Sequence, residues 1–200
     1  MFLKRIGIYS GAFDPVHAGH IAFALQALRQ AQLDEVYFLP ERRPRNKLGV
    51  EHFAHRVAML KQATLPYRQL DVLESVEVSF SVKTTLPMLK QKFKKAQLVF
   101  LFGSDTVLDL PNWPYASQLL KSCELVVAVR ARKETATRKL QAAISDWVTP
   151  PKAATVLSSY APAVSSTVIR EALRQRQPTA GLLKSVARYS DHHWLYVSIR

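Results

Sequence analysis

Cysteine, glycine and acidic residues are scarce in this chain of 200 residues, and each scarcity excludes a class of protein. The single cysteine, Cys123, cannot form an internal disulfide, which excludes a disulfide-stapled secreted scaffold. Six glycines and 11 prolines are too few for a collagen-like or low-complexity chain. No apolar run approaches the roughly 20 residues that a membrane-spanning helix needs. We therefore expect a soluble, cytoplasmic, globular protein with no membrane partner.

Acidic residues are outnumbered by basic ones, 15 against 28, so the formal net charge is +13. This sign suits a protein that binds several phosphate groups, and it equally suits a well-solvated basic surface. The basic residues form short clusters, such as residues 42–47 and 90–95, and no basic tail. Sequence-independent RNA binding needs aromatic residues among the basic ones, and the second cluster has only Phe93. We expect no nucleic-acid partner, and a non-catalytic nucleotide- or RNA-binding module is the weaker alternative.

Short apolar runs alternate with stretches of helical periodicity along the whole chain. This alternation is typical of parallel βαβ units with helices on both faces of one sheet. The sequence predicts a single α/β domain over residues 1–200, a doubly wound, Rossmann-like parallel sheet, with residues 164–200 as a helical C-terminal subregion. The expected strands are residues 5–10, 35–39, 70–73, 97–102, 124–129 and 154–157, and the expected helices are residues 18–32, 51–63, 82–95, 133–144, 166–175 and 179–189.

The first strand leads into a turn whose residues suit a bound phosphate group. Gly11 lets the backbone turn tightly and approach a ligand closely. The free amides at the start of the following helix favour an anion there. His17 and His20 are three residues apart, so both can point the same way from the first helical turn. They suit phosphate binding best; capping of the turn and metal ligation with a third, unrecognised ligand are the alternatives.

Three motifs resemble those of a known family, in the same order and over nearly the whole chain. Residues 11–20 read GAFDPVHAGH, similar to the G-x-F-D-P-x-H-x-G-H signature of the nucleotidyltransferase superfamily. Residues 164–170 read VSSTVIR, which resembles I-S-S-T-x-I-R. Between them, GSD at residues 103–105 resembles G-x-D, with Trp113 following. Within the superfamily, the chain looks most like the nicotinate (nicotinamide) mononucleotide adenylyltransferases.

The resemblance implies that ATP is bound at both ends of the chain and that a few side chains neutralise its phosphates. His17, His20, Lys47 and Arg170 are the implied catalytic residues. From the residues alone, Asp105 can instead cap a helix, the two serines can cap another, and Arg170 can lie on the surface. The implied ATP-binding residues are Gly11, Ala12, Phe13, His17, His20, Gly103, Asp105, Ser165, Ser166 and Arg170.

The acceptor side departs from the family in two places. The implied acceptor-binding residues are Lys47, Thr84 and Trp113, and Trp113 can equally be a core aromatic; Arg130, at the end of a strand, is a further candidate. Residues 44–47 read PRNK where the family has P-P-H-K, and residues 79–84 read SFSVKT where it has S-Y-T-x-D-T. The substituted positions are Arg45, Asn46 and Lys83. These departures leave the acceptor open.

The implied reaction is adenylyl transfer from ATP to the phosphate of nicotinate mononucleotide, giving deamido-NAD and pyrophosphate. Nicotinamide mononucleotide or another phosphorylated acceptor is the alternative substrate. Mg²⁺ is implied as a cofactor held mainly by ATP phosphates, without a dedicated protein metal site. Residues 17–20 also resemble the H-I-G-H motif of class I aminoacyl-tRNA synthetases, but the chain lacks their K-M-S-K-S loop and is too short for their anticodon domain. The oligomeric state stays open, a homo-oligomer included.

Overall fold

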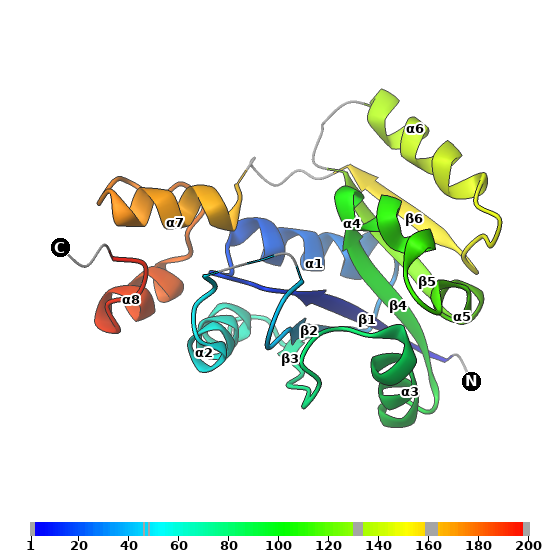
Figure 1. Ribbon diagram of the computed structural model, residues 1–200, viewed down its shortest axis with the longest axis horizontal. Coiled ribbons are helices and arrows are strands. Elements are labelled where there is room, and N and C mark those ends of the chain that lie inside the picture. The colour runs from blue at the N-terminus through cyan, green and yellow to red at the C-terminus, as the bar shows by residue number, and fades with distance from the viewer. Residues whose placement is uncertain (1–2, 46, 48, 130–133, 159–163, 198–200) are drawn as a thin grey trace.

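Six parallel strands form one sheet in the order β3-β2-β1-β4-β5-β6 (Figure 1). The computed structural model describes residues 3–45, 47, 49–129, 134–158 and 164–197. The predicted Rossmann-like α/β fold is confirmed, because this strand order is that of a doubly wound sheet. The strands are β1 (Lys4–Gly11), β2 (Glu35–Pro40), β3 (Leu70–Val72), β4 (Ala96–Gly103), β5 (Glu124–Val129) and β6 (Ala154–Ser158).

Helices connect the strands and cover both faces of the sheet (Figure 1). Six of them match the expected helices within a few residues; the last begins later than expected, at Lys184. Two short helices and a 3-10 turn between β4 and β5 were not expected. The helices are α1 (Ala18–Gln30), α2 (Phe53–Thr64), α3 (Val82–Lys92), α4 (Ser104–Asp109), the 3-10 turn η1 (Leu110–Asn112), α5 (Ala116–Ser122), α6 (Glu134–Ser145), α7 (Ser166–Arg174) and α8 (Lys184–His192).

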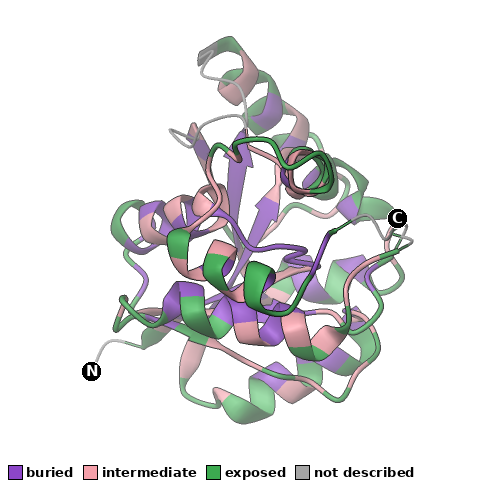
Figure 2. Cartoon of the chain, turned by 90° about the vertical axis from the view of Figure 1, so that its left-hand side faces the viewer, coloured by how far each residue is buried: buried purple, intermediate pink, exposed green. Residues whose placement is uncertain are grey.

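The sheet separates two apolar cores, and β4 shows how one strand serves both. Phe100 and Phe102 contribute to the core beneath α3 and α5, whereas Val99 and Leu101 contribute to the core beneath α1 and α2. Successive side chains of a strand point to opposite faces, so a continuously apolar strand must be covered on both sides. Figure 2 shows the resulting band of buried residues through the strands. Burial on both faces fixes the sheet and therefore the positions of its strand ends.

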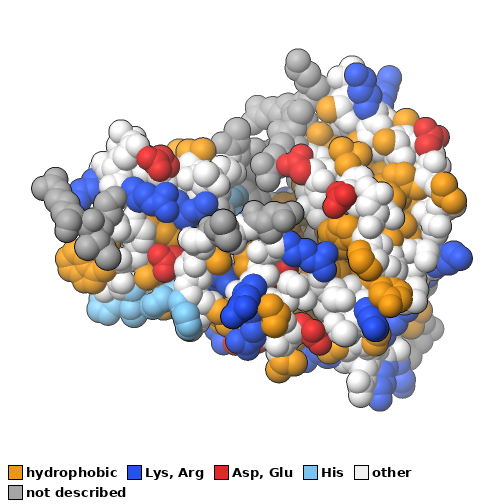
Figure 3. All heavy atoms as spheres, viewed as in Figure 1, with side chains coloured by type: hydrophobic (Ala, Val, Ile, Leu, Met, Phe, Trp, Pro, Cys, Tyr) orange, Lys and Arg blue, Asp and Glu red, His pale blue; other side chains and the backbone are white. Residues whose placement is uncertain are grey.

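The C-terminal helices α7 and α8 lie together at one end of the molecule, with α8 packed on α2 (Figure 1). His55, His192 and His193 gather where α8 meets α2, and Figure 3 shows imidazoles grouped at that end. Lysine and arginine side chains are spread over several elements on the face shown in Figure 3. No helix in the described part of the chain has the length and apolar character needed to cross a membrane.

Gly7 of β1 offers a test of how tightly the sheet is packed. A Cβ added there would lie 2.8 Å from Val36 Cγ2 and 2.9 Å from Leu33 Cδ1. We expect Gly7→Ala to lower the free energy of unfolding by about 1–3 kcal/mol through overpacking, measured by urea denaturation. Gly103→Ser is the control: a Cβ there meets no atom within 4 Å, and serine suits a helix N-cap. A Gly7→Ala variant as stable as the wild type would contradict this expectation, because it would show that the side chains of Val36 and Leu33 can move aside without loss of stability.

Candidate active site

The motifs meet at the carboxyl ends of β1 and β4, the point at which the strand order reverses. Ligands of doubly wound sheets bind in the crevice outside this point. β1 ends at Gly11 and β4 at Gly103, and the two strands are paired. A Cβ on Gly103 would meet no protein atom within 4 Å, so packing within the protein does not require glycine there. The missing side chain leaves room for a ligand at the end of β4.

The turn after β1 corrects one expectation about Gly11. We expected Gly11 to supply the tight turn, but its backbone is not in the left-handed region; Phe13 is, with φ of 50°. A Cβ on Gly11 would lie 3.2 Å from the Phe13 ring, so the glycine makes room for this ring. Phe13 is buried and packs edge-on against His20 and Tyr9. An aromatic wedge, rather than the glycine, shapes the loop that leads into α1.

His17 and His20 cap the helix that they begin. His17 is the N-cap of α1, and its Nδ1 accepts a hydrogen bond from the backbone N–H of Gly19 at 3.1 Å. His20 Nδ1 accepts in turn from the backbone N–H of His17 at 3.2 Å. The two rings stack with their centroids 3.7 Å apart. The pair forms a capping box, with imidazoles in place of the usual hydroxyl and carboxylate.

These caps decide where the ring protons are. Because a backbone N–H donates to each Nδ1, that nitrogen carries no proton and the neutral ring holds its proton on Nε2. Two stacked rings, inclined by 29°, therefore each carry an Nε2–H donor at the N-terminus of α1, where the helix dipole already favours an anion. Capping and phosphate binding are thus compatible, since they use opposite nitrogens of each ring. No group of three or more histidine, cysteine or acidic side chains is placed to hold a metal ion in the parts of the chain described above.

The start of α7 reaches across to the loop after β1. Ser166 Oγ donates to the carbonyl oxygen of Pro15 at 3.0 Å. Arg170 Nη1 donates to the carbonyl oxygen of Asp14 at 2.6 Å, and its Nη2 donates to Thr167 Oγ1 at 3.3 Å. Ser165 Oγ caps α7 by accepting from Val168 N. The structure therefore brings the first and last predicted motifs into direct contact.

Asp14 joins three parts of the chain through one buried carboxyl group, and the sequence analysis had not selected it. Its side chain is 1% exposed. Oδ1 accepts from the Tyr196 hydroxyl at 2.7 Å and from the Glu51 backbone N–H at 3.3 Å, while Oδ2 lies 3.7 Å from Arg170 Nη1. Burial, followed by the negative charge of Asp14, raises the pKa of Tyr196, which keeps its hydroxyl a donor. The last described residues are thereby fastened to the loop after β1.

Arg56 holds the same loop from the opposite side and was likewise missed. Its side chain is fully buried and donates to three carbonyl oxygens: Ala12 at 2.7 Å, Glu51 at 2.9 Å and Arg42 at 3.0 Å. Burial lowers the pKa of the guanidinium. One feature of the sequence indicated that Arg56 is buried: it falls on the apolar stripe that includes Phe53 and Leu60 of the expected helix. A charge on a core-facing position marks a buried polar contact.

Two further predicted site residues, Asp105 on the ATP side and the acceptor-side Lys47, are both exposed. Asp105 lies exposed in the first turn of α4, whose N-cap is Gly103, so the interpretation of Asp105 as a helix cap is wrong. Its charge still favours the start of the helix. Lys47 is exposed in the loop after β2. Its neighbour Asn46 lies outside the described residues.

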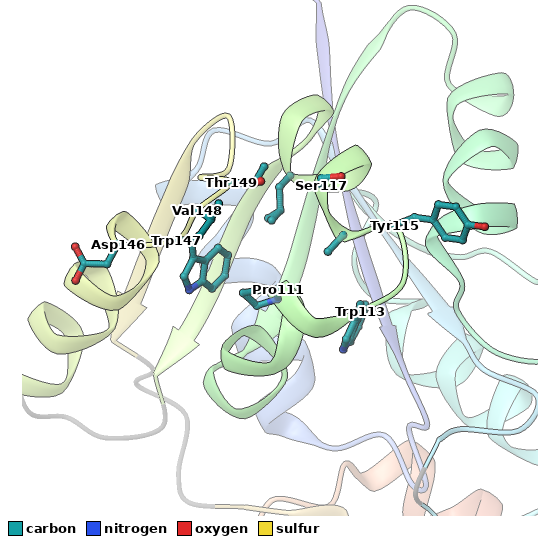
Figure 4. Close-up of a pocket in the computed structure, with 10 residues that line it drawn as sticks. Pro111, Trp113, Tyr115, Ser117, Asp146, Trp147, Val148 and Thr149 are labelled. Carbon is teal, nitrogen blue, oxygen red and sulfur yellow. The ribbon is translucent and has the colours of Figure 1, made fainter.

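On the acceptor side, Trp113 has a mixed environment. Its ring packs against Phe80 and Phe102, with centroid distances of 6.0 and 5.9 Å, and its Nε1 donates to Asp109 Oδ2. Another part of it lines a cavity of about 550 Å³ next to η1 and α5 (Figure 4). Thr84 is exposed in the first turn of α3. Arg130, the remaining candidate, lies outside the described residues.

Comparison with known proteins identifies the family of the chain. Residues 8–172 match the cytidylyltransferase-like family, and the chain belongs to this family of nucleotidyltransferases. It is 33% identical over 204 residues to the nicotinate-nucleotide adenylyltransferase of Bacillus subtilis, which covers 98% of this chain and 100% of that protein. The fold is shared with the nicotinic acid mononucleotide adenylyltransferase of Plasmodium falciparum complexed with NaAD. That likeness has a TM-score of 0.75 at 17% identity, and it covers 96% of this chain and 97% of that one.

Arg56 gives the sharpest test of how the site is supported. Arg56→Lys keeps the charge but cannot serve three carbonyl oxygens in the same geometry. We expect the free energy of unfolding to fall by about 2–4 kcal/mol in urea denaturation, because buried acceptors lose their donors. We also expect weaker ATP binding in calorimetry, since Ala12 is released. Arg43→Lys, an exposed change in the same loop as Arg42, should stay within about 0.5 kcal/mol of wild type; equal effects of the two changes would refute this role of Arg56.

Proposed function

We propose that this chain transfers the adenylyl group of ATP to the phosphate of nicotinate mononucleotide, giving deamido-NAD and pyrophosphate. The observation that carries the proposal is the meeting of His17, His20 and Arg170 around the loop after β1. All three side chains can bind an anion. The two histidines lie at the N-terminus of α1, and Arg170 contacts the loop that precedes this helix. The name of the Bacillus subtilis relative and the bound molecule of the Plasmodium falciparum structure support the same chemistry.

The reaction needs an in-line displacement at the α-phosphorus of ATP. An oxygen of the mononucleotide phosphate forms the new bond to this phosphorus, and the bond to the bridging oxygen of the β-phosphate breaks, releasing pyrophosphate. The attacking oxygen is already anionic, so no general base is required. Catalysis then consists of positioning the two substrates and neutralising the charge that moves to the leaving group.

The histidine pair supplies donors to the phosphates without reorganisation. The backbone hydrogen bonds to both Nδ1 atoms hold the rings in place and leave Nε2 as the nitrogen of each ring that would donate to the α- and β-phosphates. Preorganised donors of this kind stabilise developing charge because they are already oriented when the reaction begins. Arg170 would bind the leaving pyrophosphate through N–H groups that its contacts with Asp14 and Thr167 leave over. Ser166 and the first amides of α7 complete this side.

Gly103 and the start of α4 form the opposite wall for the nucleotide. The space beside Gly103 admits the ribose or base of ATP, and Asp105 follows in the first turn of α4 as a hydrogen-bond acceptor. On the acceptor side, Lys47 would neutralise the mononucleotide phosphate, while Trp113 and Thr84 border the pyridine ring. Both walls rise from adjacent strand ends, so the two substrates would lie over the same edge of the sheet.

Mg²⁺ would accompany ATP rather than occupy a protein cage. The ion prefers six oxygen ligands and commonly keeps several waters together with substrate phosphates. The described residues supply a histidine-rich site with donor N–H groups, which suits phosphate oxygens rather than the ion itself. Bound in this way, Mg²⁺ would neutralise part of the triphosphate charge. The side chains named above position and neutralise the rest.

Pyrophosphate release from ATP tests the proposal directly. The assay compares nicotinate mononucleotide, nicotinamide mononucleotide and a blank without acceptor, all with Mg²⁺. We expect release that depends on the acceptor and is fastest with the acid form. Faster release with the amide would keep the mechanism and change the substrate. Binding of ATP without release for either acceptor would contradict the proposed function.

His20 allows the catalytic role to be separated from the capping role. We expect His20→Ala to reduce kcat by about 10²–10³-fold through loss of one oriented donor. This variant also loses the cap, which costs about 1 kcal/mol of stability. His20→Asn retains an oxygen where Nδ1 accepts from His17 but has no donor at the Nε2 position. It should show the same loss of kcat with nearly wild-type stability in thermal denaturation; near-wild-type turnover of a folded His20→Asn would remove His20 from the mechanism.

A further inference from the structure

We propose that Arg45, assisted by Lys83, makes this enzyme select an acceptor with a negatively charged aromatic ring, because the Arg45 guanidinium binds the ring carboxylate. This inference rests on the proposed function and names the residues that set its specificity. Arg45 and Lys83 are two of the three substituted positions at which the sequence departs from the family pattern. Both residues introduce a positive charge. The Arg45 guanidinium lies near the ring of Trp113 and the Lys83 ammonium near the ring of Tyr115. These two aromatic residues belong to one stretch of the chain, residues 113–115, called the aromatic segment below.

The Arg45 side chain is exposed, and one hydrogen bond holds one of its guanidinium nitrogens. Its Nη2 donates to the carbonyl oxygen of Phe80 at 2.8 Å, which orients the plane of the guanidinium. The guanidinium carbon lies 5.7 Å from the centroid of the Trp113 ring. Phe80 also packs against Trp113, so the anchor and the platform belong to one cluster. A guanidinium carries five N–H donors, so the bond to Phe80 uses only part of its donor capacity beside the Trp113 ring.

Lys83 repeats this arrangement two residues further along the aromatic segment. Its Nζ lies 5.9 Å from the centroid of the Tyr115 ring. Figure 4 shows the Tyr115 side chain directed away from the cavity and toward α3, the helix that carries Lys83. Tyr115 has a left-handed backbone, with φ of 64° and ψ of 18°, at the N-cap of α5. A tyrosine adopts this conformation at a cost, and such strain is concentrated at ligand-binding positions.

The charges of Arg45 and Lys83 are not paired with carboxylates in the part of the chain that the structure describes. The carboxylate of Asp109, four residues before Trp113, accepts hydrogen bonds from Trp113 Nε1 at 3.1 Å and from Asn112 Nδ2 at 3.3 Å. The aromatic segment therefore has two cations beside its rings, and among the described residues no carboxylate forms an ion pair with either of them. The ligand that completes this site brings both an aromatic face and a negative charge.

The acid and amide forms of the pyridine ring differ in the group that would meet Arg45. A carboxylate offers two acceptor oxygens to the guanidinium and neutralises it. A carboxamide offers one oxygen, and its NH₂ group meets N–H donors that it cannot satisfy. Loss of a charge-assisted hydrogen bond changes affinity by roughly 10- to 100-fold. Discrimination of that size is enough to define the substrate.

The test is the ratio of kcat/KM for nicotinate mononucleotide to that for nicotinamide mononucleotide, at saturating ATP. We expect Arg45→Gln to lower kcat/KM for the acid by roughly 10- to 100-fold and to leave the amide within about threefold. Arg45→Lys, which keeps the charge but not the fork, should be intermediate. Lys83→Gln should lower the same ratio by a smaller factor, because an exposed charge acts through solvent. The KM for ATP should not change in any of these variants.

Arg43→Gln is the matched control, since it removes one exposed positive charge from the same loop. It should leave the ratio unchanged. A purely structural role of Arg45 in fastening the loop to Phe80 would lower both acceptors equally and keep the ratio constant, which would overturn the proposal. An unchanged ratio in Arg45→Gln at full activity would overturn it as well.

Calorimetric titration of each mononucleotide without ATP separates this inference from the proposed function. If the wild type releases no pyrophosphate but binds the acid form in an Arg45-dependent way, the specificity proposal holds and the proposed reaction fails. If the wild type turns over the acid form and Arg45→Gln keeps the same preference, the reaction holds and the specificity proposal fails. If neither mononucleotide binds or reacts, both are wrong.

Discussion

The buried carboxylate of Asp14 and the buried guanidinium of Arg56 together hold the loop after β1, and every other part of the site depends on where that loop lies. Asp14 accepts hydrogen bonds from the Tyr196 hydroxyl and the Glu51 backbone N–H, and Arg56 donates to the carbonyl oxygen of Ala12. Burying a charged group costs free energy unless the group is hydrogen-bonded or paired, so these contacts hold each partner at a defined position. Asp14 Oδ2 makes no hydrogen bond among the described residues and has only the guanidinium of Arg170 nearby, at 3.7 Å. The histidine caps and the contacts of α7 are built on this base. Hydrogen bonds of buried polar groups therefore fix the position of this loop, and the apolar cores hold the sheet from which the loop extends.

The fold was predictable because two central strands are almost continuously apolar and because β1, β2 and β4 each end at a glycine or a proline. β4 and β5 contain almost no polar residues, and a sheet buried on both faces demands such runs. The order of parallel strands then follows from connections of helical length. The segment between β4 and β5 escaped prediction, because α4 and α5 have only six and seven residues, too few to show a period. Its conformation is decided by packing around Trp113 and by the unusual backbone of Tyr115.

The site was predictable where a motif holds several chemical groups at fixed spacing, and it was not where tertiary contacts decide. The spacing of His17 and His20 indicated that both rings face one way, and they stack. Capping by the same rings was one of the alternatives that the sequence left open, and the structure shows it. Nothing in the sequence indicated that Phe13, rather than Gly11, has the left-handed backbone in this turn. Asp14 was part of the motif without an assigned role, because its partner Tyr196 is 182 residues away. Long-range polar contacts leave little trace in local sequence.

The distance along the chain between partners also sets the order in which the molecule becomes competent. A chain emerging during synthesis folds from its N-terminal part onward, and the strands before α6 can pair as they appear. Ser166 contacts Pro15 across 151 positions, and Tyr196 contacts Asp14 across 182 positions. All six strands precede Ser166, so the sheet can form before either contact does. The loop after β1 therefore gains its last fastenings only after residues 166–196 have been synthesised.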